Sequence, residues 1–286
     1  MKVIRARVLG FCMGVRRAVE IALDEAKGVS GHIPVYTLGP LIHNPQVLET
    51  LKDQGIAILQ EGNFDDLKGK TVLIRAHGVN PQVEERLLAA GARVRDVTCP
   101  RVKKSQMEAR SLTEAGYCLF LAGEKDHGEI IGIQGYAPDC VVVANPPDAE
   151  AAAEKLHRQA PQAKTALLGQ TTLSADEYGA IGERIRKWFP ELKIIDTICG
   201  ATRDRQNALK ELCSCVDAVI IAGGKTSANT RRLLSIAQSL NKPAWLVENE
   251  GEIPGEIGTY AVVGLSAGAS TPDTVIDAVE KALYAL

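Results

Sequence analysis

One short segment occurs three times in this chain, each time around a cysteine. The cysteines are Cys12, Cys99 and Cys199. The second and third copies match from an aspartate three positions before the cysteine to a glutamine seven positions after it, at an offset of 100 residues. A local zinc knuckle uses cysteines only a few residues apart. The long, regular spacing instead predicts three similar units that each contribute one thiolate to a shared centre.

The length of the chain gives a different first estimate of its organisation. At about 150 residues per domain, 286 residues would form roughly two domains. The repeat favours three smaller α/β units, which we expect at residues 13–98, 99–197 and 198–286. Units of this size lie within the range of compact domains.

Composition excludes several classes of protein. The formal net charge of −2 does not suggest the basic surface that nucleic acids require. No apolar run approaches the ~18 residues of a membrane helix, and the N-terminus lacks the apolar core of a signal peptide. We therefore expect a cytoplasmic protein without nucleic-acid or membrane partners. Its seven cysteines are then metal or redox candidates and not a disulfide framework.

Short apolar runs alternate with amphipathic helical patterns, which predicts βα units with small, mainly parallel sheets. The segments 144–147 and 248–258 are interpreted as surface turns. The expected strands are 3–9, 35–38, 71–75, 93–97, 117–122, 165–168, 193–198, 218–222 and 260–264, and the expected helices include 16–26, 46–54, 82–90, 175–189 and 272–284.

Six polar loops lie at similar distances after the three cysteines, each between an expected strand and an expected helix. Ligands of open α/β sheets bind at the carboxyl ends of the strands. The loops can therefore face one central cavity if the units pack with pseudo-threefold symmetry. The residues that mark these loops are His43, His77, His127, Thr171, Ser227 and Ser270.

Each repeated cysteine is expected near a helix N-terminus, where the backbone dipole favours a thiolate. Iron–sulfur clusters are normally held by four thiolates, so three would leave one iron open to substrate. The alternative to a cluster site is that these three are buried structural cysteines. A zinc site is disfavoured because the chain has no Cys-x-x-Cys. The remaining cysteines, Cys118, Cys140, Cys213 and Cys215, are interpreted as packing residues.

The loop residues suit a phosphate or diphosphate. Histidines, hydroxyls, the amide of Asn229 and helix N-termini can all donate hydrogen bonds to an anion. Taken singly, a serine or threonine here is more often a helix cap. No Walker-type loop is present, which disfavours a nucleoside triphosphate. Glu129 can act as a proton donor, although Glu124 and Asp126 in the same loop are not ranked below it by chemistry alone.

Several motifs in order resemble the 4-hydroxy-3-methylbut-2-enyl diphosphate reductase family, an iron–sulfur family of the non-mevalonate isoprenoid pathway. The resemblance covers nearly the whole chain. The motifs are Gly-Phe-Cys-x-Gly-Val at 10–15, His-Asn-Pro at 43–45, Arg-Ala-His-Gly-Val at 75–79, Asp-Val-Thr-Cys-Pro at 96–100, His-x-Glu at 127–129, Gln-Thr-Thr-Leu-Ser at 170–174, Asp-Thr-Ile-Cys-x-Ala-Thr-x-x-Arg-Gln at 196–206, Ser-x-Asn at 227–229 and Gly-Ala-Ser-Thr-Pro at 268–272.

The resemblance implies a trefoil-like α/β fold with one central 4Fe–4S cluster, and an N-terminal strand within residues 1–12 that joins the third unit. It implies that the three repeated cysteines ligate the cluster, that Glu129 supplies protons and that Thr171 lies near the substrate hydroxyl. The family reaction reduces an allylic diphosphate to isopentenyl and dimethylallyl diphosphate, with a donor such as ferredoxin or flavodoxin. The implied substrate-binding residues are His43, His77, His127, Thr171, Ser227, Ala228, Asn229 and Ser270, with Ala228 contributing only its backbone.

Two other classes of function compete with this reductase. A cluster-bearing redox sensor or binding protein would not turn over a substrate. The carboxylate of Glu129 in one of the polar loops disfavours this class. A cluster-dependent hydro-lyase would also use an open iron but would need no electrons. Turnover with and without a reductant separates the hydro-lyase from the reductase.

Overall fold

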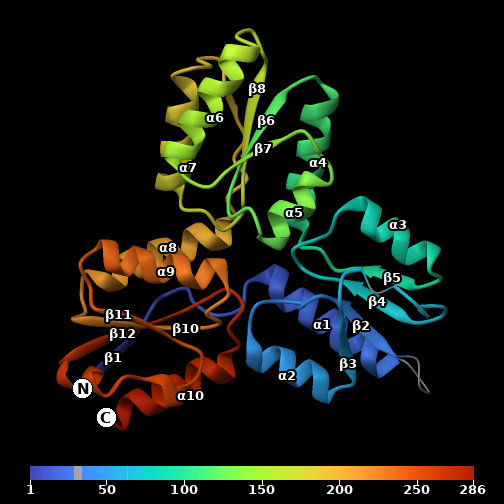
Figure 1. The fold of residues 1–286 in the computed structure, drawn as a ribbon. Helices are drawn as coiled ribbons and strands as arrows, with labels where there is room; N and C mark the ends of the chain where they lie inside the picture. The colour runs from blue at the N-terminus through green and yellow to red at the C-terminus, as the bar shows by residue number, and fades with distance from the viewer. Residues whose placement is uncertain (29–33, 63) are drawn as a thin grey trace. The chain divides into compact units, whose positions relative to one another are not determined.

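The computed structural model of the chain describes residues 1–28, 34–62 and 64–286, so His32 lies outside the described residues. Its strands form three sheets of four strands, and every strand pair is parallel (Figure 1). Parallel sheets are normally covered on both faces, so their central strands are apolar throughout. This arrangement confirms the predicted α/β class with three small parallel sheets.

The first sheet along the chain has the order β3-β2-β4-β5. Its central strand β4 is buried at all four positions, as a strand covered on both faces should be. The helices in this part of the sequence are α1 (Met13–Gly28), α2 (Pro45–Asp53) and α3 (Pro81–Ala89). The strands are β2 (Val35–Leu38), β3 (Ile56–Leu59), β4 (Thr71–Ile74) and β5 (Arg93–Asp96).

The second sheet has the order β7-β6-β8-β9 and a core built on strands β6 and β8. Its strands are β6 (Cys118–Ala122), β7 (Val141–Val143), β8 (Thr165–Gly169) and β9 (Lys193–Ile194). The helices between Cys99 and Cys199 are α4 (Pro100–Glu114), α5 (Gly128–Gln134), α6 (Pro146–Gln159) and α7 (Ala175–Arg186).

The third sheet has the order β1-β12-β10-β11 and combines the two ends of the chain. The register places Lys2 beside Val262 and Arg5 beside Leu265. Its strands are β1 (Lys2–Arg5), β10 (Ala218–Ala222), β11 (Ala244–Val247) and β12 (Val262–Ala267). The helices of this part are α8 (Gly200–Cys213), α9 (Ala228–Ser239) and α10 (Asp273–Tyr284), with 3-10 turns η1 (Glu250–Glu252) and η2 (Gly255–Thr259).

All three sheets share one strand order. Read from one edge, the orders are β5-β4-β2-β3, β9-β8-β6-β7 and β1-β12-β10-β11. Strand β1 therefore occupies the position that β5 and β9 hold in the other sheets. Each of these three edge strands leads along the chain to one repeated cysteine. The repeat in the sequence is thus a repeat of topology, and the expected pairing of the N-terminal strand with the last sheet is observed.

By compactness the chain divides into two units. The first comprises residues 1–19, 42–54 and 200–286, and the second comprises residues 20–41 and 55–199. The boundaries 13–98, 99–197 and 198–286 stay a prediction. Within the described residues, no helix combines the length and apolar character needed to cross a membrane.

Several expected elements differ from those observed. Residues 144–147 are not a surface turn, because α6 begins at Pro146; its N-cap Asn145 accepts a 2.9 Å hydrogen bond from the Asp148 N–H. Proline suits a first helical turn, where its missing donor costs nothing. Strand β9 has two residues and β1 ends at Arg5, both shorter than expected. Strands β3, β7 and β11 were not anticipated. Cys215 is exposed beyond the end of α8 and is therefore not a packing residue.

Candidate active site

Each repeated cysteine directly precedes or caps a helix. Cys99 is the N-cap of α4, and Cys12 and Cys199 immediately precede α1 and α8. The Val15 N–H lies 3.5 Å from the Cys12 sulfur, within reach of a weak hydrogen bond. All three are partly exposed, and none forms a disulfide within the part of the chain that the structure describes. Unpaired N–H groups at a helix start favour a thiolate. The expected position of the cysteines at helix N-termini is therefore confirmed.

The same backbone hydrogen bond anchors all three cysteines. The N–H of Cys99 donates to Ala76 at 2.9 Å, and that of Cys199 donates to Thr171 at 3.0 Å. In the other unit, the Cys12 N–H donates to Ala269 at 3.1 Å. Each acceptor carbonyl belongs to the polar loop that follows the neighbouring strand β4, β8 or β12. The fold therefore fixes each cysteine directly to a loop that also carries candidate binding residues.

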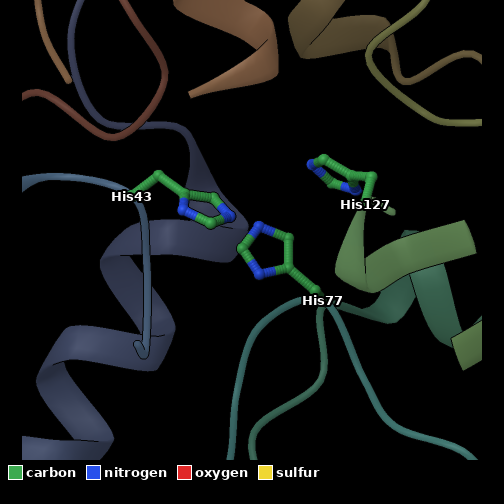
Figure 2. Close-up of side chains that lie close together, drawn as sticks. All are labelled: His43, His77 and His127. Atoms are coloured by element: carbon green, nitrogen blue, oxygen red, sulfur yellow. The ribbon is translucent and has the colours of Figure 1, made fainter. Parts of the chain in front are cut away.

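Two candidate histidines meet within the second unit. The rings of His77 and His127 lie edge to face with centroids 5.2 Å apart; Figure 2 also labels His43, which belongs to the first unit. His127 is the N-cap of α5, and its Nδ1 accepts a 3.2 Å hydrogen bond from the Glu129 N–H. A neutral ring that accepts through Nδ1 carries its proton on Nε2. The cap thus sets His127 to donate from Nε2, which is the polarity an anion needs.

Glu129 and Thr171 form a buried pair in the same unit. The Thr171 N–H donates to Oε1 of Glu129 at 2.7 Å, and the Thr171 hydroxyl donates to Oε2 at 2.8 Å. Glu129 is only 1% exposed. Burial raises the pKa of Glu129 to about 7, although the two hydrogen bonds from Thr171 act to lower it. Glu124 is half-buried and Asp126 is exposed, so the structure ranks Glu129 first among the three carboxylates.

The first unit gathers another group of polar residues. Ser227 caps α9, and its Oγ accepts a 3.4 Å hydrogen bond from Thr230. Ala228 and Asn229 follow and are buried. Both amide atoms of Asn229 lack a hydrogen-bond partner among the described residues. A buried amide without a partner costs stability unless a ligand or water satisfies it.

His43 and Ser270 also come together in the first unit. The Ser270 hydroxyl donates to the His43 carbonyl at 3.1 Å. A Cβ atom at Gly224 would lie 2.4 Å from the same carbonyl, so only glycine allows this approach. His43 is followed by Asn44, which caps α2 by accepting from the Val47 N–H at 3.1 Å. These contacts fix the backbone at His43 and at the residue after it.

Comparisons with known proteins identify the family of the chain. The family model described as "LytB protein" matches residues 3–284. This chain belongs to the LytB family.

LytB relatives and structures resemble the chain along almost its whole length. A 4-hydroxy-3-methylbut-2-enyl diphosphate reductase of Treponema denticola is 46% identical over 99% of both chains. The enzyme of the same name from Aquifex aeolicus is 41% identical over 98% of this chain and 94% of its own. The structure of the E-1-hydroxy-2-methyl-but-2-enyl-4-diphosphate reductase from Plasmodium falciparum has a TM-score of 0.89 at 30% identity, covering 96% of this chain and 86% of that one. The LytB chain described above is therefore an enzyme, an oxidoreductase.

One buried cation near a repeated cysteine, Arg205, stands in the 196–206 motif of this LytB chain, which by itself assigns it no role. Arg205 in α8 donates from Nε and Nη2 to the Gly10 carbonyl at 3.1 and 2.6 Å, and from Nη1 to Ala201 at 2.7 Å. It is 4% exposed. Gly10 lies two residues before Cys12, so Arg205 holds the approach to that cysteine. The repeat gave no signal, because the counterpart at the 100-residue offset is Ser105.

Proposed function

We propose that this chain reduces 4-hydroxy-3-methylbut-2-enyl diphosphate to isopentenyl diphosphate and dimethylallyl diphosphate, the last step of the non-mevalonate isoprenoid pathway. The substrate takes up two electrons and two protons, its C–O bond breaks, and the hydroxyl leaves as water. The names of the LytB relatives support the substrate. The observation that carries the proposal is the buried carboxyl of Glu129, held by Thr171, because this chemistry needs a proton donor that stays protonated near neutral pH.

The three repeated cysteines suit one 4Fe–4S cluster. Cys12, Cys99 and Cys199 lie at helix starts, form no disulfide among the described residues, and are each anchored by the same backbone hydrogen bond. Thiolates are the ligands such clusters require. When bound, the cluster supplies electrons one at a time together with one iron that lacks a protein ligand. The proposed physiological source of electrons is a small donor protein such as ferredoxin or flavodoxin.

Each unit, taken by itself, holds proposed donors for the diphosphate. In the second unit these are His77 and His127. The Nε2 atom of His127 carries the proton that it would donate. In the first unit the amide of Asn229 has no hydrogen-bond partner among the described residues. A phosphate oxygen can accept a hydrogen bond from this amide. Helix starts add backbone N–H groups that favour anions. The full proposed set is His43, His77, His127, Ser227, the backbone of Ala228, Asn229 and Ser270, with Thr171 near the substrate hydroxyl.

Glu129 would hold and deliver the proton that the leaving hydroxyl needs. With a pKa of about 7, a large fraction of this carboxyl is protonated at neutral pH. The Thr171 hydroxyl lies 2.8 Å from Oε2 and orients the carboxyl. Because the carboxyl is buried, bulk water does not compete with the substrate for its proton.

The proposal is tested on anaerobically purified protein. Iron and sulfide content close to four of each per chain, together with water-releasing turnover of the hydroxylated diphosphate under a chemical reductant, is the expected result. Turnover without reductant would indicate a hydro-lyase instead. A loaded cluster without turnover in either condition would indicate a redox sensor.

A further inference from the structure

One arginine of the second unit is mostly covered and lies between two glycines. The side chain of Arg75 is 15% exposed. A Cβ atom at Gly39 would lie 2.7 Å from its Nη1, and one at Gly128 would lie 3.3 Å from its Cζ. Gly39 also has a φ of +67°, which favours glycine. The guanidinium therefore lies against both glycines, and a side chain at either position would force it to shift.

These segments are the ones that carry the candidate histidines. Gly39 begins the loop that leads to His43, four residues later. Arg75 itself lies two residues before His77. Gly128 is the residue between His127 and Glu129, at the start of α5. Within the second unit, a single guanidinium thus belongs to the segment of His77 and lies against the start of α5, which follows His127.

The charge of Arg75 is poorly compensated. Its ion pair joins Nη2 to Oε2 of Glu61 at 3.8 Å, and the Glu61 side chain is 44% exposed. The Nε atom is buried and has no hydrogen-bond partner among the described residues. Burial lowers the pKa of Arg75 and the Glu61 carboxylate raises it, but a guanidinium stays protonated at any physiological pH. Among the described residues, this cation therefore has only a loose counter-charge.

We propose that Arg75 is a positioning residue of the anion site: within the second unit it fixes the spacing of the His77 and His127 segments, and it supplies a positive charge that attracts the diphosphate without contacting it. The inference rests on the proposed function for the identity of the natural ligand. It adds an electrostatic contribution to a site whose other members are neutral donors or histidines.

The test measures binding of inorganic diphosphate by calorimetry at two salt concentrations, alongside steady-state kinetics. Arg75→Met should weaken binding and raise KM about tenfold, the scale of one charge acting across several ångströms in a protein, with kcat changed less than about threefold. Binding should also become less sensitive to salt. Arg75→Lys should recover part of the affinity, because it keeps the charge and loses the planar fork. Arg93→Met, at a 67% exposed arginine of the neighbouring strand β5, is the matched control.

Glu61→Gln gives a test that does not depend on core packing. Removing this exposed counter-charge should tighten diphosphate binding about twofold, opposite in sign to Arg75→Met. A purely structural role predicts no change or weaker binding in Glu61→Gln, and either result overturns the electrostatic part of the inference. Unchanged binding by folded Arg75→Met overturns all of it.

The proposed function and this inference fail separately. Wild-type protein that does not turn over the hydroxylated diphosphate, yet binds inorganic diphosphate in an Arg75-dependent way, contradicts the proposed function and supports the inference. Full turnover, together with diphosphate binding that does not depend on Arg75, supports the proposed function and contradicts the inference.

Discussion

Replacing Glu129 with glutamine removes one proton from the candidate active site while leaving its shape nearly unchanged. Glutamine can keep both contacts to Thr171: its carbonyl accepts from the Thr171 N–H, and its amide donates to the hydroxyl, which can reverse its role. Loss of activity in Glu129→Gln would therefore report the missing acid and not a collapsed pocket. General acids contribute about 10²–10⁴-fold to rate, so kcat should fall by that factor.

The pH profile separates an acid role from an electrostatic one. With a pKa of about 7, the carboxyl of the free enzyme is mostly protonated at pH 6 and mostly ionised at pH 8. The kcat/KM of the wild type should therefore fall about tenfold per pH unit above pH 7. The residual activity of Glu129→Gln should lose this limb. Asp126→Asn, at an exposed carboxylate of the same loop, should keep the full profile. A wild-type kcat/KM that is flat or rises across pH 6–8 would refute the assignment.

Folding stability gives an independent measure of the same proton. The folded pKa of about 7 exceeds the ordinary 4.5 of a glutamate, so the folded state binds the proton more tightly. Stability from this group is complete below pH 4.5 and is lost as the pH rises to about 7, by about 3 kcal/mol. Glutamine does not titrate. The free energy of unfolding of Glu129→Gln, relative to that of the wild type, should therefore rise as the pH increases across this window. Denaturant unfolding at pH 5 and pH 8 measures this change.

Three further predictions follow from local geometry. Thr171→Val removes a hydrogen bond that lowers the pKa of the buried carboxyl, so the midpoint of the kcat/KM profile should move above pH 7. Cys99→Ser should lose most of the iron and sulfide of anaerobically purified protein, whereas Cys215→Ser, at an exposed thiol, should retain both. Gly78→Ala should lower the free energy of unfolding by about 2–4 kcal/mol, because its φ is +73° and the new Cβ would lie 2.4 Å from a buried glutamine amide. Gly116→Ala, with a φ of +78° but open space, should cost only about 1–2 kcal/mol in the same denaturant titration.

The sequence was informative where the chain repeats its own pattern. Strands of alternating βα units are apolar and separated by recognisable helices, so the class and most of the strands were predictable. The position of each cysteine at a helix start followed from Pro100 and from the shared motif. Short or exposed edge strands were missed: β3 has two exposed positions of four, and β7 has only three residues. Edge strands carry little apolar signal, because they pack on fewer neighbours than central strands.

Contacts made across long sequence distances were the part that sequence could not supply. The ranking of Glu129 over Glu124 depends on Thr171, 42 residues away, which both buries and bonds the carboxyl. The environment of Arg75 depends on two glycines, one directly after β2 and one at the start of α5. A glycine in a sequence shows only that a side chain is absent, whereas the structure shows which neighbour needs the space.

The repeated units share one backbone arrangement. Different residues at equivalent positions give the copies different chemistry. Gly123 and Gly223 share a positive φ of +154° and +143°, and the helix caps His127 and Ser227 follow at the same offset of 100 residues. Two positions further on, one copy has Glu129 and the other has Asn229. Both side chains are buried at the start of a helix. The carboxyl can give up a proton, whereas the amide can only hold a ligand by hydrogen bonds. Equivalent positions in one fold can therefore provide acid catalysis in one unit and anion binding in another.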